Sequence, residues 1–242
     1  MNLIDAEPSA PPVFSRRREA AKGLRSSLAA GLGMFPLGIA FGLLVVQAGL
    51  PWWLAPALST AAFAGSLELL LVGMIVTATP LATIALTTFL VNFRHVFYSF
   101  SFPLQVVKHP LAKVYSMYAM IDEAYAVTAA SKERWNSWRL ITMQLAFQCY
   151  WVVGGLVGVG ISSLLPGRIE GLEFALCALF VTLTLDAARS GKQLPSLLLG
   201  AASFAAAVVL APDASLFLGL LLFLALLIVR FAFSRRRGDS DA

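Results

Sequence analysis

The sequence predicts an all-α, polytopic integral membrane protein with about eight transmembrane helices. Of its 242 residues, 59% are hydrophobic and only 13% are charged, and the mean hydropathy is +0.80. A soluble domain carries about 25% charged residues, so this chain has too few polar side chains to cover a globule. Its apolar runs are also continuous and long enough to cross a bilayer as helices, whereas the strands of a membrane barrel alternate over about ten residues.

Seven apolar stretches each predict a transmembrane helix. They cover residues 26–48, 53–77, 80–103, 140–165, 171–188, 194–211 and 214–233. The first stretch is longer than the core of a signal peptide, about 7–15 residues, and no small-x-small cleavage site ends it, so we interpret it as a span. Gly38 with Gly42, and Gly154 with Gly158, form GxxxG patterns that let helices approach closely.

The charges at the two ends of the chain require an even number of crossings. Five basic residues precede the first span, and four more lie at the C-terminal end of the chain. Both ends of the chain therefore prefer the cytoplasm. The missing crossing is residues 111–130, which have the length to span a bilayer but contain Asp122 and Glu123. The alternative is an interfacial amphipathic helix over the same residues, which leaves seven spans and an external C-terminus.

The predicted organisation is one transmembrane domain with polar ends and no enzymatic site. Residues 1–25 form a disordered basic cytoplasmic tail, residues 26–233 the transmembrane helical domain, and residues 234–242 a second cytoplasmic tail. The net charge of +5 lies at the tails and loops, where it sets orientation and does not indicate nucleic-acid binding. Zinc, serine-nucleophile and phosphate-loop signatures are missing. We therefore predict no enzyme activity, no cofactor and no metal.

The run from Asn92 to His95 places charge inside an apolar segment. A charged residue at the bilayer centre costs about 2.5–3.5 kcal/mol on insertion scales, so a partner or a substrate must compensate. Arg94 offers a planar fork suited to a carboxylate, and His95 is a natural proton relay. Arg94 lies about nine residues from the end of its span, on the order of 13 Å, which weakens the alternative that it reaches the interface.

Two acidic positions and one proline complete the candidate site. The charge count gives Arg94 two expected partners on neighbouring spans, Glu68 and Asp122. Glu68 could pair with Arg94, bind a substrate ammonium or take up a proton, and a purely structural ion pair is the equal alternative. Asp122 and Glu123 are adjacent carboxylates, so one of them holds a proton or meets a cation unless they form an acidic edge at the interface. Pro36 removes a helical hydrogen bond. The resulting break in a transporter helix can hold a carboxylate, and a plain kink is the alternative.

Four segments fall in the order of a known family. They are residues 33–42 (GMFPLGIAFG), 63–66 (FAGS), 92–99 (NFRHVFYS) and 122–123 (DE). On these segments the chain resembles the AzlC family, the large subunit of branched-chain amino acid exporters, over about residues 20–235. The resemblance implies export of L-valine and related amino acids from the bacterial cytoplasm, together with a small AzlD-type membrane partner. The family often has glutamine where this chain has Glu68.

We therefore predict a multi-pass transporter subunit of the bacterial inner membrane that exports neutral branched-chain amino acids and uses the proton gradient. The residues predicted to bind substrate are Pro36, Gly38, Glu68, Asn92 and Arg94. Those predicted to couple protons are Glu68, His95, Asp122 and Glu123. The alternatives are a channel or uptake permease for another small polar solute, and a non-transporting membrane scaffold. The lipid bilayer and the small subunit are the predicted partners, and nucleic acid is not.

Overall fold

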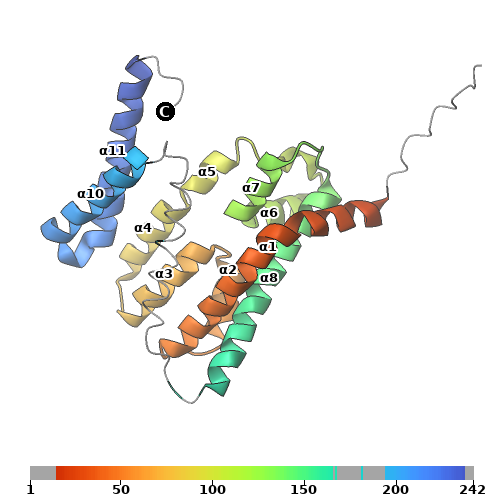
Figure 1. Ribbon diagram of the computed structural model, residues 1–242, viewed down its shortest axis with the longest axis horizontal. Coiled ribbons are helices and arrows are strands. Elements are labelled where there is room, and N and C mark those ends of the chain that lie inside the picture. The colour runs from red at the N-terminus through yellow and green to blue at the C-terminus, as the bar shows by residue number, and fades with distance from the viewer. Residues whose placement is uncertain (1–14, 166, 168–180, 182–193, 238–242) are drawn as a thin grey trace, which may run out of the picture. The chain divides into compact units, whose positions relative to one another are not determined.

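The computed structural model describes residues 15–165 and 194–237, together with Gly167 and Val181 (Figure 1). Within these residues all regular structure is helical. The chain divides into two compact units, Met1–Leu70 with Arg94–Leu165, and Leu71–Phe93 with Pro166–Ala242. The predicted span over residues 171–188 lies outside the described residues, apart from Val181.

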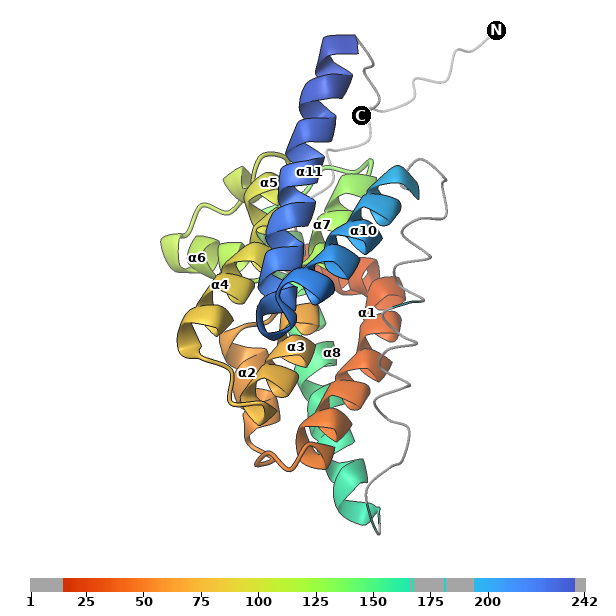
Figure 2. The same cartoon turned by 90° about the vertical axis from the view of Figure 1, so that its left-hand side faces the viewer.

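The first unit is built on two long helices, α1 (Arg16–Gln47) and α8 (Ser137–Leu164), which lie side by side in both ribbon views (Figures 1 and 2). A Cβ added at Gly42 would lie 1.9 Å from the carbonyl oxygen of Gly155, and one added at Gly158 would lie 2.1 Å from that of Ile39. Only glycine allows this backbone approach, so the structure confirms that the GxxxG patterns serve close helix packing.

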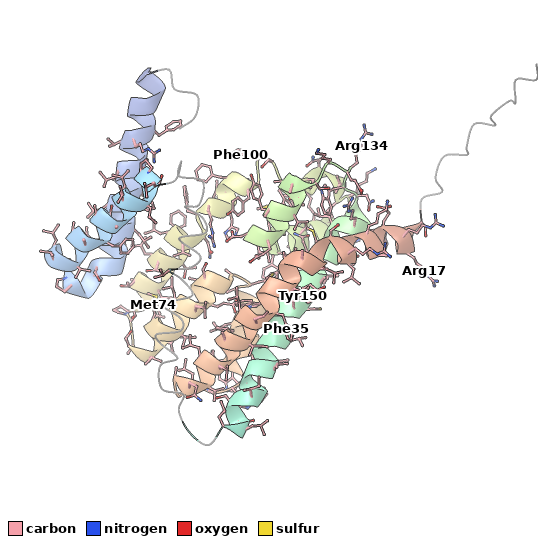
Figure 3. The ribbon with its side chains drawn as sticks, in the orientation of Figure 1. Arg17, Phe35, Met74, Phe100, Arg134 and Tyr150 are labelled. Carbon is pink, nitrogen blue, oxygen red and sulfur yellow. The ribbon has the colours of Figure 1, made fainter. Side chains whose placement is uncertain are left out.

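The two long helices run in the same direction. At their N-terminal ends, the Asn136 side-chain amide donates a hydrogen bond to Glu19. At their C-terminal ends, Gln47 Nε2 donates to Ser162 Oγ at 3.2 Å. Phe35 and Tyr150 mark the middle of this parallel pair (Figure 3).

Shorter helices complete the first unit. They are α2 (Leu54–Ala61), α5 (Arg94–Tyr98), α6 (Pro110–Tyr118), α7 (Asp122–Ala130) and the first half of α3 (Gly65–Val76). Of these, α2 and α6 pack mainly against α8, and α7 contacts both α1 and α8. A 3₁₀ turn, η1 (Leu104–Val106), joins α5 to α6. Phe41 from α1 stacks on Trp151 from α8, with ring centroids 5.8 Å apart, and both residues are buried in the core.

The second unit contains α4 (Leu81–Asn92), α10 (Leu194–Leu210) and α11 (Ser215–Arg237). A 3₁₀ turn, η2 (Pro212–Ala214), reverses the chain so that α10 and α11 form an antiparallel hairpin. Gly219 of α11 lies against the ring of Phe204 of α10, where an added Cβ would approach to 2.8 Å. Helix α4 contacts α11.

Three helical stretches among the described residues are long and apolar enough to cross a membrane. They are α1, the stretch Leu81–Tyr98 formed by α4 and α5, and α8, while Gly65–Val76, Leu194–Leu210 and Phe217–Ala232 are shorter apolar helices. The chain is thus an all-helical protein of the membrane class, as the composition predicts.

Helix α1 begins at Arg16, ten residues before the predicted first span and inside the predicted tail of residues 1–25. Its opening residues include arginine, glutamate, alanine and lysine, which favour helix. Lys22 Nζ also pairs with Glu19 Oε1 at 2.9 Å, three residues apart on one face. The polar start of α1 is therefore a helical extension of the first span.

Candidate functional site

The predicted spans over residues 53–77, 80–103 and 111–130 are each interrupted. The chain leaves the helical conformation at residues 62–64 and 119–121. At Phe93 the backbone stays in the right-handed helical region, but Phe93 N bonds to the Leu90 carbonyl three residues back, at 3.4 Å, and α4 gives way to α5. The polar residues of the candidate site follow these interruptions closely, and helix ends leave main-chain groups without helical partners. The interruptions are therefore where polar chemistry concentrates in an otherwise apolar chain.

Arg94 and Asp122 form an ion pair in the first unit. Arg94 Nη2 lies 2.9 Å from Asp122 Oδ2 and donates a second hydrogen bond, of 3.1 Å, to Ser66 Oγ at the start of α3. The Arg94 and Asp122 side chains are 41% and 40% exposed, so both remain accessible. Asp122 is one of the two partners that charge matching predicts for Arg94, and it meets the cation expected of the Asp122–Glu123 pair.

Tyr98 ties the ion pair to an aromatic cluster. Its hydroxyl donates to Asp122 Oδ1 at 2.9 Å, and its ring stacks on Tyr125 with centroids 4.2 Å apart. The rings of His95 and Tyr98 lie in a T-shaped arrangement, with their centroids 5.5 Å apart. Both oxygens of Asp122 are thus engaged, one by a guanidinium and one by a phenol, which fixes the direction of the carboxylate.

Glu68 does not pair with Arg94. It is completely buried, and its carboxylate accepts three hydrogen bonds, from Ser59 Oγ at 2.8 Å, Ala64 N at 3.0 Å and Trp151 Nε1 at 2.9 Å. The bond from Ala64 resembles the acidic half of a capping box, in which a side chain reaches back to the start of its own helix. The pairing of Glu68 with Arg94, one of the predicted possibilities, is thus replaced by a local cap.

The break between α2 and α3 separates a main-chain donor from its helical acceptor. In a continuous helix the Ala64 N–H would bond to the Thr60 carbonyl four residues earlier. Here Glu68 accepts from Ala64 N, and the Tyr118 hydroxyl donates to Thr60 O at 2.5 Å. Phe63, in the break, has a φ of 42°, a left-handed conformation that is uncommon for a residue with a side chain.

The break between α6 and α7 is supported by Gln144 of α8. Its Nε2 donates to the carbonyls of Ser116 and Ala119, both at 2.9 Å, and Gln144 is completely buried. These carbonyls lie at the C-terminal end of α6, where helical donors are missing. One side-chain amide thus satisfies two main-chain acceptors and ends α6 before Asp122.

The other predicted site residues lie elsewhere or in supporting positions. Gly38 faces α8, where an added Cβ would lie 2.8 Å from the Trp151 carbonyl oxygen, and α1 continues as one helix through Pro36. Asn92 is the last residue of α4, in the second unit. Glu123 follows Asp122 in the first turn of α7 and is half-buried.

Several residues that contact the candidate site or support its helix breaks were not predicted as site residues, among them Ser59, Tyr125 and Trp151. They also include Ser66, Tyr98, Tyr118 and Gln144. A usable signal existed for Gln144, because it and Gln148 are polar residues four apart on one face of an apolar span. Among the described residues, no three His, Cys, Asp or Glu side chains group in a way that could hold a metal ion.

Helices of membrane-spanning length, interrupted spans and an ion pair beside the interruptions define a polytopic helical membrane protein with a polar centre. The family model described as AzlC protein matches residues 29–165. That range is more than half of the 242 residues, so the chain belongs to the AzlC family, and the resemblance drawn from its motifs is confirmed.

Curated relatives cover most of the chain at low identity. The branched-chain amino acid transport protein AzlC of Bacillus subtilis is 27% identical over 181 residues, which are 74% of this chain and 71% of that protein. An uncharacterized membrane protein of Haemophilus influenzae is 26% identical, over 69% of this chain and 70% of its own. The inner membrane protein YgaZ of Escherichia coli is 24% identical, over 72% and 75%. No solved structure matches the chain.

Proposed function

We propose that this protein is the large subunit of an exporter of neutral branched-chain amino acids such as L-valine. It works in the bacterial inner membrane, uses the proton gradient and acts with a small AzlD-type membrane subunit. The substrate class is supported by the name of the Bacillus subtilis relative, and the inner membrane by that of the Escherichia coli relative. The family is one of transport proteins, which favours a non-enzymatic role.

The observation that carries this proposal is the accessible Arg94–Asp122 pair. A neutral amino acid is a zwitterion, with a carboxylate and an ammonium on one carbon. The Arg94 fork suits the carboxylate, and Asp122 suits the ammonium. The substrate carboxylate can therefore replace Asp122 as the partner of Arg94, and the substrate ammonium can replace Arg94 as the partner of Asp122. Neither side chain is then left without an opposite charge.

Proton coupling is assigned to the groups around this pair. His95 lies against the Tyr98 ring, and Glu123 follows Asp122 on α7. A proton taken by either group changes the net charge beside the substrate, which links proton movement to binding. Glu68 is enclosed by three donors, so we assign it a positioning role instead of substrate contact.

The parallel course of α1 and α8 supports eight crossings. Two parallel neighbours in a membrane need an odd number of crossings between them. The three apolar segments at residues 53–77, 80–103 and 111–130 supply three, whereas an interfacial 111–130 would leave two. The direction of α8 therefore favours a crossing by residues 111–130, as the charge count does, and the three crossings after α8 rest on the sequence alone.

The N-terminal ends of α1 and α8 are proposed to face the cytoplasm. Arg17 and Arg134 lie at this shared end (Figure 3), and basic residues in this position favour the cytoplasmic side. The basic residues of this end are Arg16, Arg17, Arg18, Lys22, Arg25, Lys132, Arg134 and Arg139.

An efflux assay tests the proposed function. Cells loaded with labelled amino acids would express the chain alone, the chain with an AzlD-type subunit, or neither, and release would be followed over a panel of amino acids. The proposal predicts release of L-valine that needs both subunits and is abolished by an uncoupler. Release that continues in the presence of the uncoupler would favour a channel. No release from cells that express the chain, with or without the AzlD-type subunit, would favour a scaffold.

A further inference from the structure

The break between α2 and α3 is held by side chains from α6 and α8 and by Glu68 of α3. The hydroxyl of Tyr118, on α6, donates a hydrogen bond to the Thr60 carbonyl oxygen. Gln148 Nε2 of α8 donates to the same hydroxyl at 3.0 Å. On the other side of the break, the Ala64 N–H is held by Glu68. Since a main-chain group without a partner is costly inside a membrane protein, these contacts determine whether the break is stable.

The break also sets the position of Ser66. Residue 66 lies in the first turn of α3, two residues after Ala64, and its hydroxyl accepts from Arg94 Nη2 at 3.1 Å. Gly65 must lack a Cβ here, because one would approach the Trp151 ring to 2.9 Å. A change in the break therefore moves the hydroxyl that orients Arg94.

The competing arrangement is a closed helix. If Thr60 O loses the phenol, the Ala64 N–H is its nearest helical donor. Closing that bond would return Phe63 from its left-handed φ of 42° to the helical region and rotate the start of α3. The phenol and the carboxylate thus select the broken form against a closed one.

We propose that Tyr118 is a positioning residue of the transport site. Its hydroxyl keeps the α2–α3 break open, and through the break it holds Ser66 against Arg94. This inference deepens the proposed function and rests on it for the identity of the substrate. The residue touches the Thr60 carbonyl and Gln148, and it acts on the substrate only through Arg94.

The test compares Tyr118→Phe with Tyr150→Phe. Both changes remove one phenol hydroxyl from the first unit, and the Tyr150 hydroxyl lies 3.3 Å from Ser27 Oγ, at the α1–α8 contact. Uptake of labelled L-valine into everted vesicles that contain both subunits gives KM and kcat. We expect Tyr118→Phe to raise KM by about 5- to 30-fold, the range for loss of one or two kcal/mol, and Tyr150→Phe to leave KM within about twofold.

A double-mutant cycle separates positioning from general destabilisation. If Tyr118 acts through Ser66, Tyr118→Phe combined with Ser66→Ala raises KM no more than the larger single change does. The product of the two single effects, or a Tyr118→Phe effect on KM no larger than that of Tyr150→Phe, would overturn the proposal.

A second readout does not depend on transport. In a Cys149→Ser, Cys177→Ser background, the thiol introduced by Ser66→Cys is labelled with a polar methanethiosulfonate reagent. We expect Tyr118→Phe to change the labelling rate at least fivefold and Tyr150→Phe to change it less than twofold. Equal rates in the two variants contradict the positioning role. If wild-type vesicles fail to move L-valine while the labelling difference persists, the proposed function fails and the role of Tyr118 in the break stands.

Discussion

Replacing Glu68 by glutamine probes the carboxylate that stabilises the α2–α3 break. The substitution preserves shape but exchanges one acceptor oxygen for an NH₂ donor. Oε1 accepts from Ala64 N, and Oε2 accepts from Ser59 and Trp151. In whichever orientation the amide settles, at least one buried donor faces another donor.

The favoured orientation leaves only the indole without an acceptor. With the amide oxygen toward Ala64 N, the Ser59 hydroxyl can turn to accept from the new NH₂, but the Trp151 indole can only donate. A buried donor left unpaired costs about 1–3 kcal/mol. At about 2–4 °C per kcal/mol for a chain of this size, Glu68→Gln should lower the melting temperature by about 2–12 °C.

The assay is thermal unfolding of the purified protein in detergent for a four-variant cycle. Trp151→Phe removes the indole donor but keeps a ring to stack on Phe41. In that background the decrease in the free energy of unfolding caused by Glu68→Gln should be smaller than in the wild type by about 1–3 kcal/mol. Trp138, which is 45% exposed, gives the control, and Trp138→Phe should add independently to Glu68→Gln. Additive effects for Glu68→Gln and Trp151→Phe would refute the hydrogen-bond account.

Three further predictions follow from other parts of the first unit. Gly158→Ala should destabilise the protein by about 1–3 kcal/mol, since the added Cβ would lie 2.1 Å from the α1 backbone. Gly160→Ala is the control: the space around Gly160 is open, so this change should leave the melting temperature nearly the same or raise it. Asp122→Asn should raise the KM for L-valine about tenfold or more, because charged hydrogen bonds contribute about 1.5–3 kcal/mol; an unchanged KM would remove Asp122 from the binding site. The pKa of Glu19, which precedes the apolar part of α1, is lowered below its ordinary 4.5, mainly by the hydrogen bond from Lys22. Its stabilising effect is therefore complete above the ordinary pKa and disappears as the pH falls through the lower folded-state value, so the melting temperatures of wild type and Glu19→Gln should differ at pH 7 and converge in acid.

Apolar run length and charge matching predicted the parts of the fold that local composition determines. The spans expected at residues 140–165 and 194–211 match α8 and α10 within three residues, because a continuous helix satisfies the main-chain hydrogen bonds of an apolar stretch within the stretch itself. Asp122 was also predictable as a partner of Arg94, since a cation inside an apolar chain needs an anion close by.

The helix interruptions were not predictable from the residues where they occur. Residues 62–64 and 119–121 contain neither glycine nor proline, and they are stabilised from outside, by Tyr118 and Gln144. Such distant contacts leave no local pattern. The same reason explains the role of Glu68, whose partners include an indole 83 positions away in the sequence.

Uptake of L-valine into everted vesicles that contain both subunits, compared between wild type and Arg94→Ala, tests the central claim most directly. The zwitterion site also predicts that 3-methylbutanoate, which lacks the ammonium, and isobutylamine, which lacks the carboxylate, compete poorly with L-valine in the wild type. We expect Arg94→Ala to abolish saturable uptake while the protein remains in the membrane at the wild-type amount. Unchanged L-valine uptake by Arg94→Ala would contradict the claim that Arg94 and Asp122 bind the transported amino acid.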